Sequence, residues 1–381
     1  MSGMVFSKND TNAMKGIAIL FMMFHHCFAT PDRFEKYDVS FAPLSQEWGV
    51  LLSYTLKICV GMFVFLSAYG MTIAMKSRDR EYSLSASQVA AFTSNRLIRL
   101  MGGYMLVFIL THVISIALGQ GRMKVVYGEG VKACIGVIID FFGLGDVMGT
   151  PVYLATWWYM SLAIILILVF PFLVFVYKKS GIFSIPLIAL VPFVFTIQYT
   201  NMIRYIPVMI VGVVFADRNW MVKIRQWKIK ENSILSHGIK FILEIFLIYG
   251  LFKGRNSEYN YQLIAIWDSF LPVVILLFSY EFVAVIPGFR TVLKFIGKHS
   301  MNIFLTHNFF RVFWCPDFIY HFRSAWLISL ALLGVSLVFS IMIELLKKLI
   351  HFNQGIECIR KKVESKILNM DIGVGSNDIC E

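Results

Sequence analysis

Residues 152–177, VYLATWWYMSLAIILILVFPFLVFVY, form a long apolar run that contains no charged side chain. A helix needs about 20 apolar residues to cross the hydrocarbon core of a bilayer, so this run is long enough to span it. The rest of the chain is similar, because 58% of its 381 residues are hydrophobic and only 15% are charged. Soluble domains carry about 25% charged residues. The sequence therefore predicts an all-α polytopic integral membrane protein.

The same length rule predicts about ten transmembrane helices in one bundle. A further apolar stretch, 131–142, is short, and it is expected to dip into the membrane or to lie on its surface. With that choice the basic loops gather on one side, which the positive-inside rule makes cytoplasmic together with both termini. The predicted spans lie near 14–30, 49–75, 98–118, 152–177, 182–199, 202–216, 239–253, 261–283, 299–315 and 325–346.

These spans predict one integral membrane domain, residues 1–350, followed by a polar cytoplasmic tail, residues 351–381. Within the tail, QGIECIRKKVESKIL (354–368) is expected to form a short amphipathic helix. Basic loops at the membrane surface account for the net charge of +12, so the lipid bilayer is an expected partner and nucleic acid is not. The six cysteines have no metal-binding spacing, and no metal site is predicted.

Ionisable side chains interrupt the first apolar run, KGIAILFMMFHHCF (15–28). At about 100° and 1.5 Å per residue, Lys15 and His26 share one helix face and lie roughly 16 Å apart, whereas His25 is turned away by about 80°. Charged groups inside spans are costly and usually functional. The alternative is an ordinary cytoplasmic anchor at Lys15 and interfacial positions for the two histidines.

A second polar stripe lies in GKHSMNIFLTHNFFRVF (297–313), where Ser300, His307 and Arg311 fall close to one face. His307 is expected at a depth similar to that of His26, so two histidines from distant spans can converge in one cavity. An interhelical hydrogen bond by His307 is the simpler alternative. Lys57 and Asp268, also within spans, are expected to face the cavity or to pair with each other.

Five segments, taken in order, resemble the motifs of the bacterial acyltransferase-3 family of membrane O-acyltransferases. KGIAILFMMFHH is similar to the family's first-span pattern of a basic residue, ten positions and a histidine. GMFVFLSAYG (61–70) resembles its phenylalanine-rich second span, and TWWYM (156–160) its Trp-Phe-Leu segment. NRLIRLMGGY (95–104) resembles its Arg-x-x-Arg motif, and GKHSMNIFLTH its late Gly-x-x-Ser…Leu-x-His element. The matching residues are Lys15, His26, Ser67, Arg96, Arg99, Gly297, Ser300 and His307.

Two positions depart from the family pattern. Lysine at position 15 replaces the usual arginine, so that a point charge stands where the family has a planar guanidinium. Ala68 replaces a glycine of the second span.

The resemblance implies transfer of an acyl group, most often acetyl from acetyl-CoA, to a hydroxyl of a cell-surface polysaccharide or lipid-linked sugar at the bacterial cytoplasmic membrane. Acyl-CoA is then a co-substrate, and no permanently bound cofactor is expected. Lys15, Arg96 and Arg99 at the cytoplasmic mouth suit its phosphates. Ser67 and Tyr69 are expected to make further contacts with it.

A sugar hydroxyl needs a base, and His26 is the predicted general base, a role that contributes typically 10²–10⁴-fold. A covalent acyl-His26 intermediate is the alternative. His307, Ser300 or Tyr69 is expected to orient the base or to stabilise the oxyanion. His25 is a further candidate, either as a supporting residue beside His26 or as an alternative base. A transporter or flippase of glycan precursors is the rival function. The acceptor sugar, the acyl chain length and the oligomeric state stay open.

Overall fold

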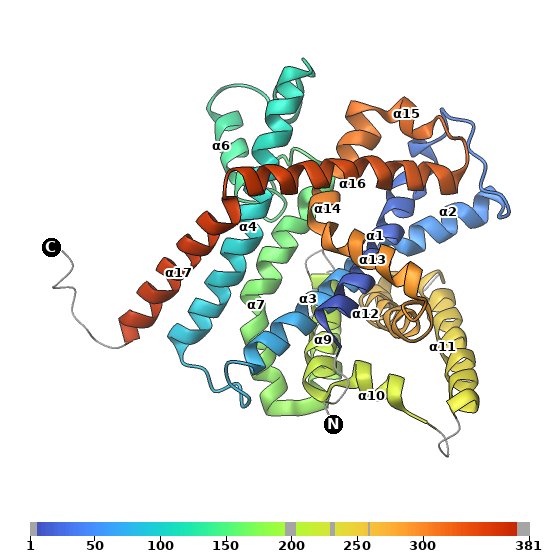
Figure 1. Cartoon of the computed structure of the whole chain (residues 1–381), viewed down its shortest axis with the longest axis vertical. Coiled ribbons are helices and arrows are strands. Elements are labelled where there is room, and N and C mark those ends of the chain that lie inside the picture. The colour runs from blue at the N-terminus through green and yellow to red at the C-terminus, as the bar shows by residue number, and fades with distance from the viewer. Residues whose placement is uncertain (1–5, 195–202, 229–232, 258–259, 372–381) are drawn as a thin grey trace. The chain divides into compact units, whose positions relative to one another are not determined.

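The computed structural model describes residues 6–194, 203–228, 233–257 and 260–371 (Figure 1). Helices form nearly all of its regular structure, and the described residues contain no β-sheet, only an isolated bridge between Ser40 and Ser324. The chain forms two compact units. The first combines residues 1–74 with 173–341, and the second combines 75–172 with 342–381.

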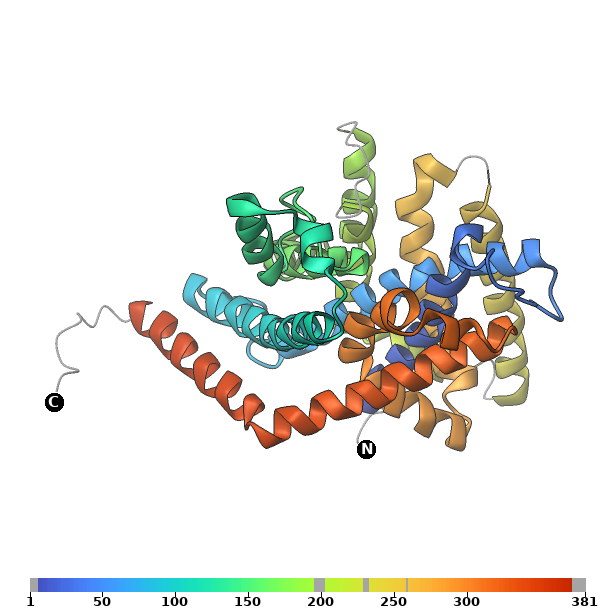
Figure 2. The same ribbon diagram turned by 90° about the horizontal axis from the view of Figure 1, so that it is seen from above.

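The first unit brings the beginning of the chain together with much of its second half. In Figure 2, α11 and α12 lie side by side within it. The helices that lie wholly or mostly in this unit are α1 (Lys8–Phe28), α2 (Gln46–Thr55), α3 (Cys59–Lys76), α8 (Ser184–Val194), α9 (Ile206–Arg218), α10 (Trp220–Gln226), α11 (Ser233–Arg255), α12 (Asn260–Phe278), α13 (Pro287–Lys298), α14 (Ser300–Phe309), α15 (Pro316–Tyr320) and α16 (Ala325–Leu349), with a one-turn 3₁₀ helix, η2 (Leu56–Ile58), between α2 and α3.

α1 begins at a capping box, in which Ser7 and Asp10 satisfy each other's backbone N–H groups. It packs closely along α13 (Figure 1). Glycines allow this approach, since a Cβ on Gly297 would lie 1.8 Å from the Asn12 carbonyl oxygen and one on Gly16 would lie 2.2 Å from the Leu293 carbonyl oxygen. The two backbones are therefore in direct contact.

The second unit is built on α4 (Ala86–Ala117), with α5 (Arg122–Tyr127), α6 (Gly130–Phe141), α7 (Trp158–Ser180) and α17 (Phe352–Asp371). α17 runs alongside α4 (Figure 1), so the predicted helix in the tail is confirmed. α6 has 12 residues and is about 18 Å long, too short to cross a core of about 30 Å. This agrees with the expectation that 131–142 does not span.

Six helical segments of the described residues are long and apolar enough to cross a membrane, or seven if the bent pair α9–α10 counts as one span. The protein is thus a multi-pass membrane protein, but the ten predicted spans are not confirmed. Two predicted spans, 152–177 and 182–199, fall largely in one segment, Ala155–Leu190, and residues 195–199 of the second lie outside the described residues. The six segments are Gln46–Lys76, Ala86–Ala117, Ala155–Leu190, Ile234–Arg255, Leu263–Val283 and Ala325–Leu349.

Candidate functional site

Two histidines from helices far apart in the sequence meet inside the first unit. The ring centroids of His26 on α1 and His307 on α14 are 4.8 Å apart, with the ring planes inclined by 45°. His307 is fully buried, whereas the His26 side chain keeps some exposed surface. The predicted convergence of these two residues is therefore confirmed. The His26 ring lies next to the imidazole of His307.

Hydrogen bonds identify the free nitrogen of His307. Its Nδ1 lies 3.1 Å from the Ile303 carbonyl oxygen and 2.9 Å from the Phe304 carbonyl oxygen. Carbonyl oxygens only accept, so Nδ1 carries the proton, and in the neutral ring Nε2 has a free lone pair. Nε2 is buried and has no hydrogen-bond partner among the described residues. His307 therefore holds an unengaged basic nitrogen in the His26 environment.

His25 serves a different purpose from its neighbour. Its Nδ1 donates to the Ser53 carbonyl oxygen at 2.9 Å, and the Ser53 hydroxyl donates back to the Phe24 carbonyl oxygen, also at 2.9 Å. The side chain is buried between α1 and α2. The rotation of about 100° between adjacent helix positions thus directs one histidine to a helix–helix contact and the other to His307.

Two arginines lie near the histidine pair, and their charges interact with His26. Arg33, in the one-turn 3₁₀ helix η1 (Pro31–Arg33) after α1, donates from Nη1 to the carbonyl oxygens of His25 and His26 at 3.0 and 3.1 Å. Arg311, in the π-helical turn that follows α14, donates to the Asn308 side chain at 2.7 Å. The polar stripe of residues 297–313 had indicated Arg311. Arg33 was missed, because a single turn carries no periodic signal.

The other predicted site residues of this unit lie elsewhere. Ser300 is seven residues before His307, about 10 Å along the helix, so it does not contact the His307 imidazole. Tyr69 packs against Phe6, with ring centroids 5.1 Å apart, at the beginning of α1. Lys15 lies about 13 Å further along the helix axis; it is half-buried and has no ion-pair or hydrogen-bond partner among the described residues. Tyr69 therefore packs at the beginning of α1 and is not positioned to orient His26.

The two remaining residues of the second-span motif point in different directions. Ser67 is exposed on α3. Ala68 is buried and faces α9, where a Cβ on Gly212 would lie 2.9 Å from the Ala68 methyl group. Gly212 thus supplies the space that the alanine at position 68 takes up.

Arg96 and Arg99 belong to the second unit. Arg96 lies over the Phe92 ring, 5.2 Å from its centroid, and Arg99 pairs with Glu357 of α17 at 3.2 Å. Glu357 also bonds to Arg360, and these two arginines lower the pKa of its carboxyl group to about 2. Of the two arginines of the Arg-x-x-Arg motif on α4, Arg99 is thus paired with the tail helix α17 and Arg96 packs on an aromatic ring of its own helix.

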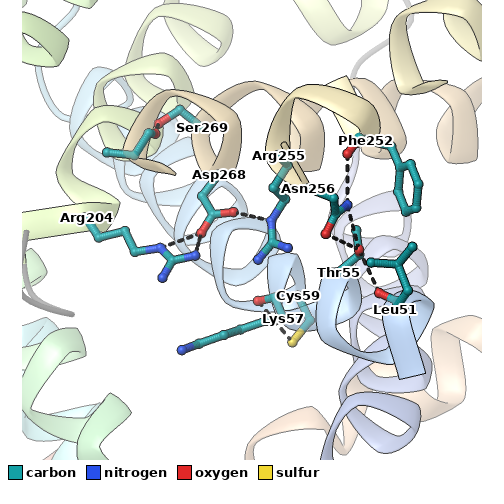
Figure 3. A network of polar contacts seen from close by, with 11 residues as sticks. Leu51, Thr55, Lys57, Cys59, Arg204, Phe252, Arg255, Asn256, Asp268 and Ser269 are labelled. Atoms are coloured by element: carbon teal, nitrogen blue, oxygen red, sulfur yellow. Dashed lines mark hydrogen bonds and ion pairs between the residues drawn. The ribbon is translucent and has the colours of Figure 1, made fainter. Parts of the chain in front are cut away.

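A second polar cluster lies within the first unit, at Asp268 (Figure 3). Arg255 Nε donates to Asp268 Oδ1 at 2.7 Å, and Arg204 Nε donates to Oδ2 at 2.5 Å. Lys57 interacts electrostatically with all three charges, but its ammonium group pairs with none of the described residues. Of the two alternatives for Lys57 and Asp268, the direct pair is not formed: Asp268 pairs with two arginines, and no ion pair joins it to the Lys57 ammonium.

Comparison with protein families gives one result. The family model described as an acyltransferase domain, that of the acyltransferase-3 family, matches residues 9–345. Comparisons with curated proteins and with solved structures find no match.

Proposed function

The chain belongs to the acyltransferase-3 family, whose model covers most of its length, and from this premise we propose that it transfers an acyl group, most simply acetyl, from cytoplasmic acyl-CoA to a hydroxyl of a cell-surface polysaccharide or lipid-linked sugar. The observation that carries the proposal is the buried contact between His26 and His307, 4.8 Å between ring centroids. Two imidazoles inside a membrane protein have a high desolvation cost if they bear charge, and such groups are typically functional.

In this proposal His26 is the general base. The acceptor oxygen attacks the thioester carbonyl as His26 takes the hydroxyl proton, and the tetrahedral intermediate then expels the CoA sulfur, which receives that proton. His307 carries its proton on Nδ1, which donates to backbone carbonyl oxygens. The Nε2 lone pair is therefore free to stabilise the His26 imidazolium that forms. The positive charges of Arg33 and Arg311 favour the developing oxyanion.

The donor is expected to approach from the opposite end of α1. Lys15 supplies a cation without a counter-charge among the described residues, and the acyl-pantetheine arm would extend along α1 toward His26, roughly 16 Å away. Arg96 and Arg99 are the further proposed phosphate contacts, by the family motif. Lysine at position 15 attracts a phosphate as a point charge without the bidentate grip of an arginine.

Mass spectrometry of envelope glycans tests the function in cells that carry the gene, lack it, or carry a variant. Cells with His26→Ala or His307→Gln should lose the mass increment of one acyl group at unchanged protein level, whereas His321→Ala, an exposed histidine of the same unit, should retain it. General-base catalysis predicts a loss of 10²–10⁴-fold in rate. Unaltered acylation with blocked glycan export would refute acyl transfer and favour a transporter.

A further inference from the structure

The cluster around Asp268 contains more positive charge than it can neutralise. Arg255 and Asp268 are fully buried and pair with each other, and Arg204, which is 14% exposed, pairs with the second carboxylate oxygen. Lys57 adds a third cation. Among the described residues Asp268 is the only carboxylate paired with these groups, so two positive charges remain without a counter-charge. Uncompensated cations inside a membrane protein are costly and usually mark a functional site.

Hydrogen-bond donors in the cluster are also unused. Arg255 donates only from Nε, and its Nη1 and Nη2 are buried without a partner among the described residues. The guanidinium lies over Tyr54, 5.3 Å from the ring centroid, which fixes its plane. Asp268 therefore holds two arginines in place while their remaining donors, and the Lys57 ammonium, stay available. Planar guanidinium groups with free donors match the geometry of phosphate and carboxylate oxygens.

The cluster is connected through α2 to α1, the helix that carries His26. Lys57 lies on η2, which directly follows α2, and α2 is fastened to α1 by the hydrogen bond from His25 to the Ser53 carbonyl oxygen, 2.9 Å long. Thr55, between these two positions, bonds to Asn256, the residue after Arg255. The charges of Lys57 and Arg255 also interact with His25. The cluster and the helix that carries His26 are therefore both in contact with the segment 53–57.

We propose that Lys57 and Arg204, backed by Arg255 and Asp268, form an oxyanion-binding site for the acyl acceptor, so that the acceptor carries a phosphate or a carboxylate group close to the hydroxyl that is acylated. This inference rests on the proposed function for the identity of the ligand as acceptor. Lys57, Arg204 and the free Nη groups of Arg255 bind the anion, whereas Asp268 is the positioning residue. The acceptor class is thereby narrowed to acidic or phosphate-linked sugars, with neutral glycans excluded.

Binding of two probes, inorganic pyrophosphate and glucuronate, to the full-length protein in detergent tests the site. At least one should bind saturably, and Lys57→Gln or Arg204→Gln should weaken it about tenfold or more, since a lost charged hydrogen bond typically has this effect. Both variants should fold, because Asp268 keeps Arg255 as its partner. Lys36→Gln, an exposed lysine of the same unit, should bind as the wild type does. Size-exclusion profiles check folding.

The outcome separates the possible sources of the anion. Tighter binding of pyrophosphate indicates a phosphate-linked acceptor, and tighter binding of glucuronate an acidic sugar. Absence of saturable binding, equal binding by the variants, or competitive displacement by coenzyme A would overturn the proposal, the last because the site would then hold the donor. Release of thiol from acetyl-CoA is measured alongside. Thiol release without anion binding refutes this inference alone, whereas Lys57-dependent binding without acyl transfer refutes the proposed function alone.

Discussion

Substitution of Gly297 by alanine tests how the contact between α1 and α13 positions the histidine pair. The new methyl group would lie 1.8 Å from the Asn12 carbonyl oxygen, 2.7 Å from its carbonyl carbon and 3.0 Å from the Gly16 nitrogen. An ordinary carbon–oxygen contact is about 3.3 Å, so the helices must separate by about 1.5 Å. All three obstructing atoms belong to the backbone, so no side-chain rotation relieves the clash.

Two effects are expected from this displacement. Overpacking of a well-packed contact typically costs about 1–3 kcal/mol, so the thermal midpoint should fall. Activity should fall further, because α1 carries His26 and α13 leads directly into α14, which carries His307. A misplacement of about 1 Å near the reacting atoms can cost about 10²-fold in rate. The rate constant for acyl transfer should therefore drop, while Gly297 itself contacts no substrate.

Gly288→Ala is the matched control, because it lies on the same helix and its added methyl group meets no atom within 4 Å. Thermal melts and thiol release from acetyl-CoA are measured for both variants in detergent. The control should keep wild-type stability and rate. If folded Gly297→Ala protein transfers acyl groups as fast as Gly288→Ala, the helix contact does not set the histidine geometry, and the reasoning is wrong.

Three further predictions concern the ion pairs and the topology. Asp268→Asn should lower the free energy of unfolding by about 3–5 kcal/mol, measured by denaturant titration, since it leaves Arg255 buried without its carboxylate; a loss below 1 kcal/mol would contradict this. The pKa of Glu357 is lowered to about 2, so the stability its ionisation adds is present above the ordinary value of 4.5 and is lost as the pH falls toward 2. The protection of α17 amides against hydrogen exchange, relative to the intrinsic exchange rate at each pH, should be constant from pH 8 to about 5 and should fall below that, and Glu357→Gln should remove the dependence. In a background without accessible cysteines, Ser77→Cys should resist an impermeant thiol reagent added outside intact cells and Asp38→Cys should react, whereas the reverse pattern would refute cytoplasmic termini.

Helical periodicity was sufficient to predict which side chains of α1 face the site. The rotation per residue separates His25 from His26, and the structure gives them the expected different environments, a backbone carbonyl for one and His307 for the other. Pairing of His26 with His307 follows from two buried histidines at similar depth. Ser300 and His307 share a face of α14, but the helical rise places them about 10 Å apart, so the role expected for Ser300 stays a prediction.

Fewer than ten helical segments of the described residues meet the length and composition expected of a span, and a physical reason contributes to the difference. Hydropathy measures the removal of a segment from water and does not distinguish burial in lipid from burial in protein. α9 illustrates this, because ten consecutive residues from Pro207 to Ala216 are buried by the first unit itself. The predicted span 299–315 coincides with one continuous helical segment, α14 followed directly by the π-helical turn η7 (Phe310–Trp314). This segment is shorter than the about 20 residues that cross a bilayer core.

The ion pairs around Asp268 were the least predictable part of the site, because their partners come from separate elements and no spacing rule links them. The sequence indicated Lys57 and Asp268 as intramembrane charges and allowed a direct pair between them. In the structure Asp268 pairs with Arg204 and Arg255 instead. These arginines lie at helix ends, where a cytoplasmic or interfacial anchor is the ordinary interpretation. What turns these arginines into site candidates is their burial and the lack of a second carboxylate among the described residues. An excess of buried cations is a property of the folded charge balance, so only the packed helices reveal it.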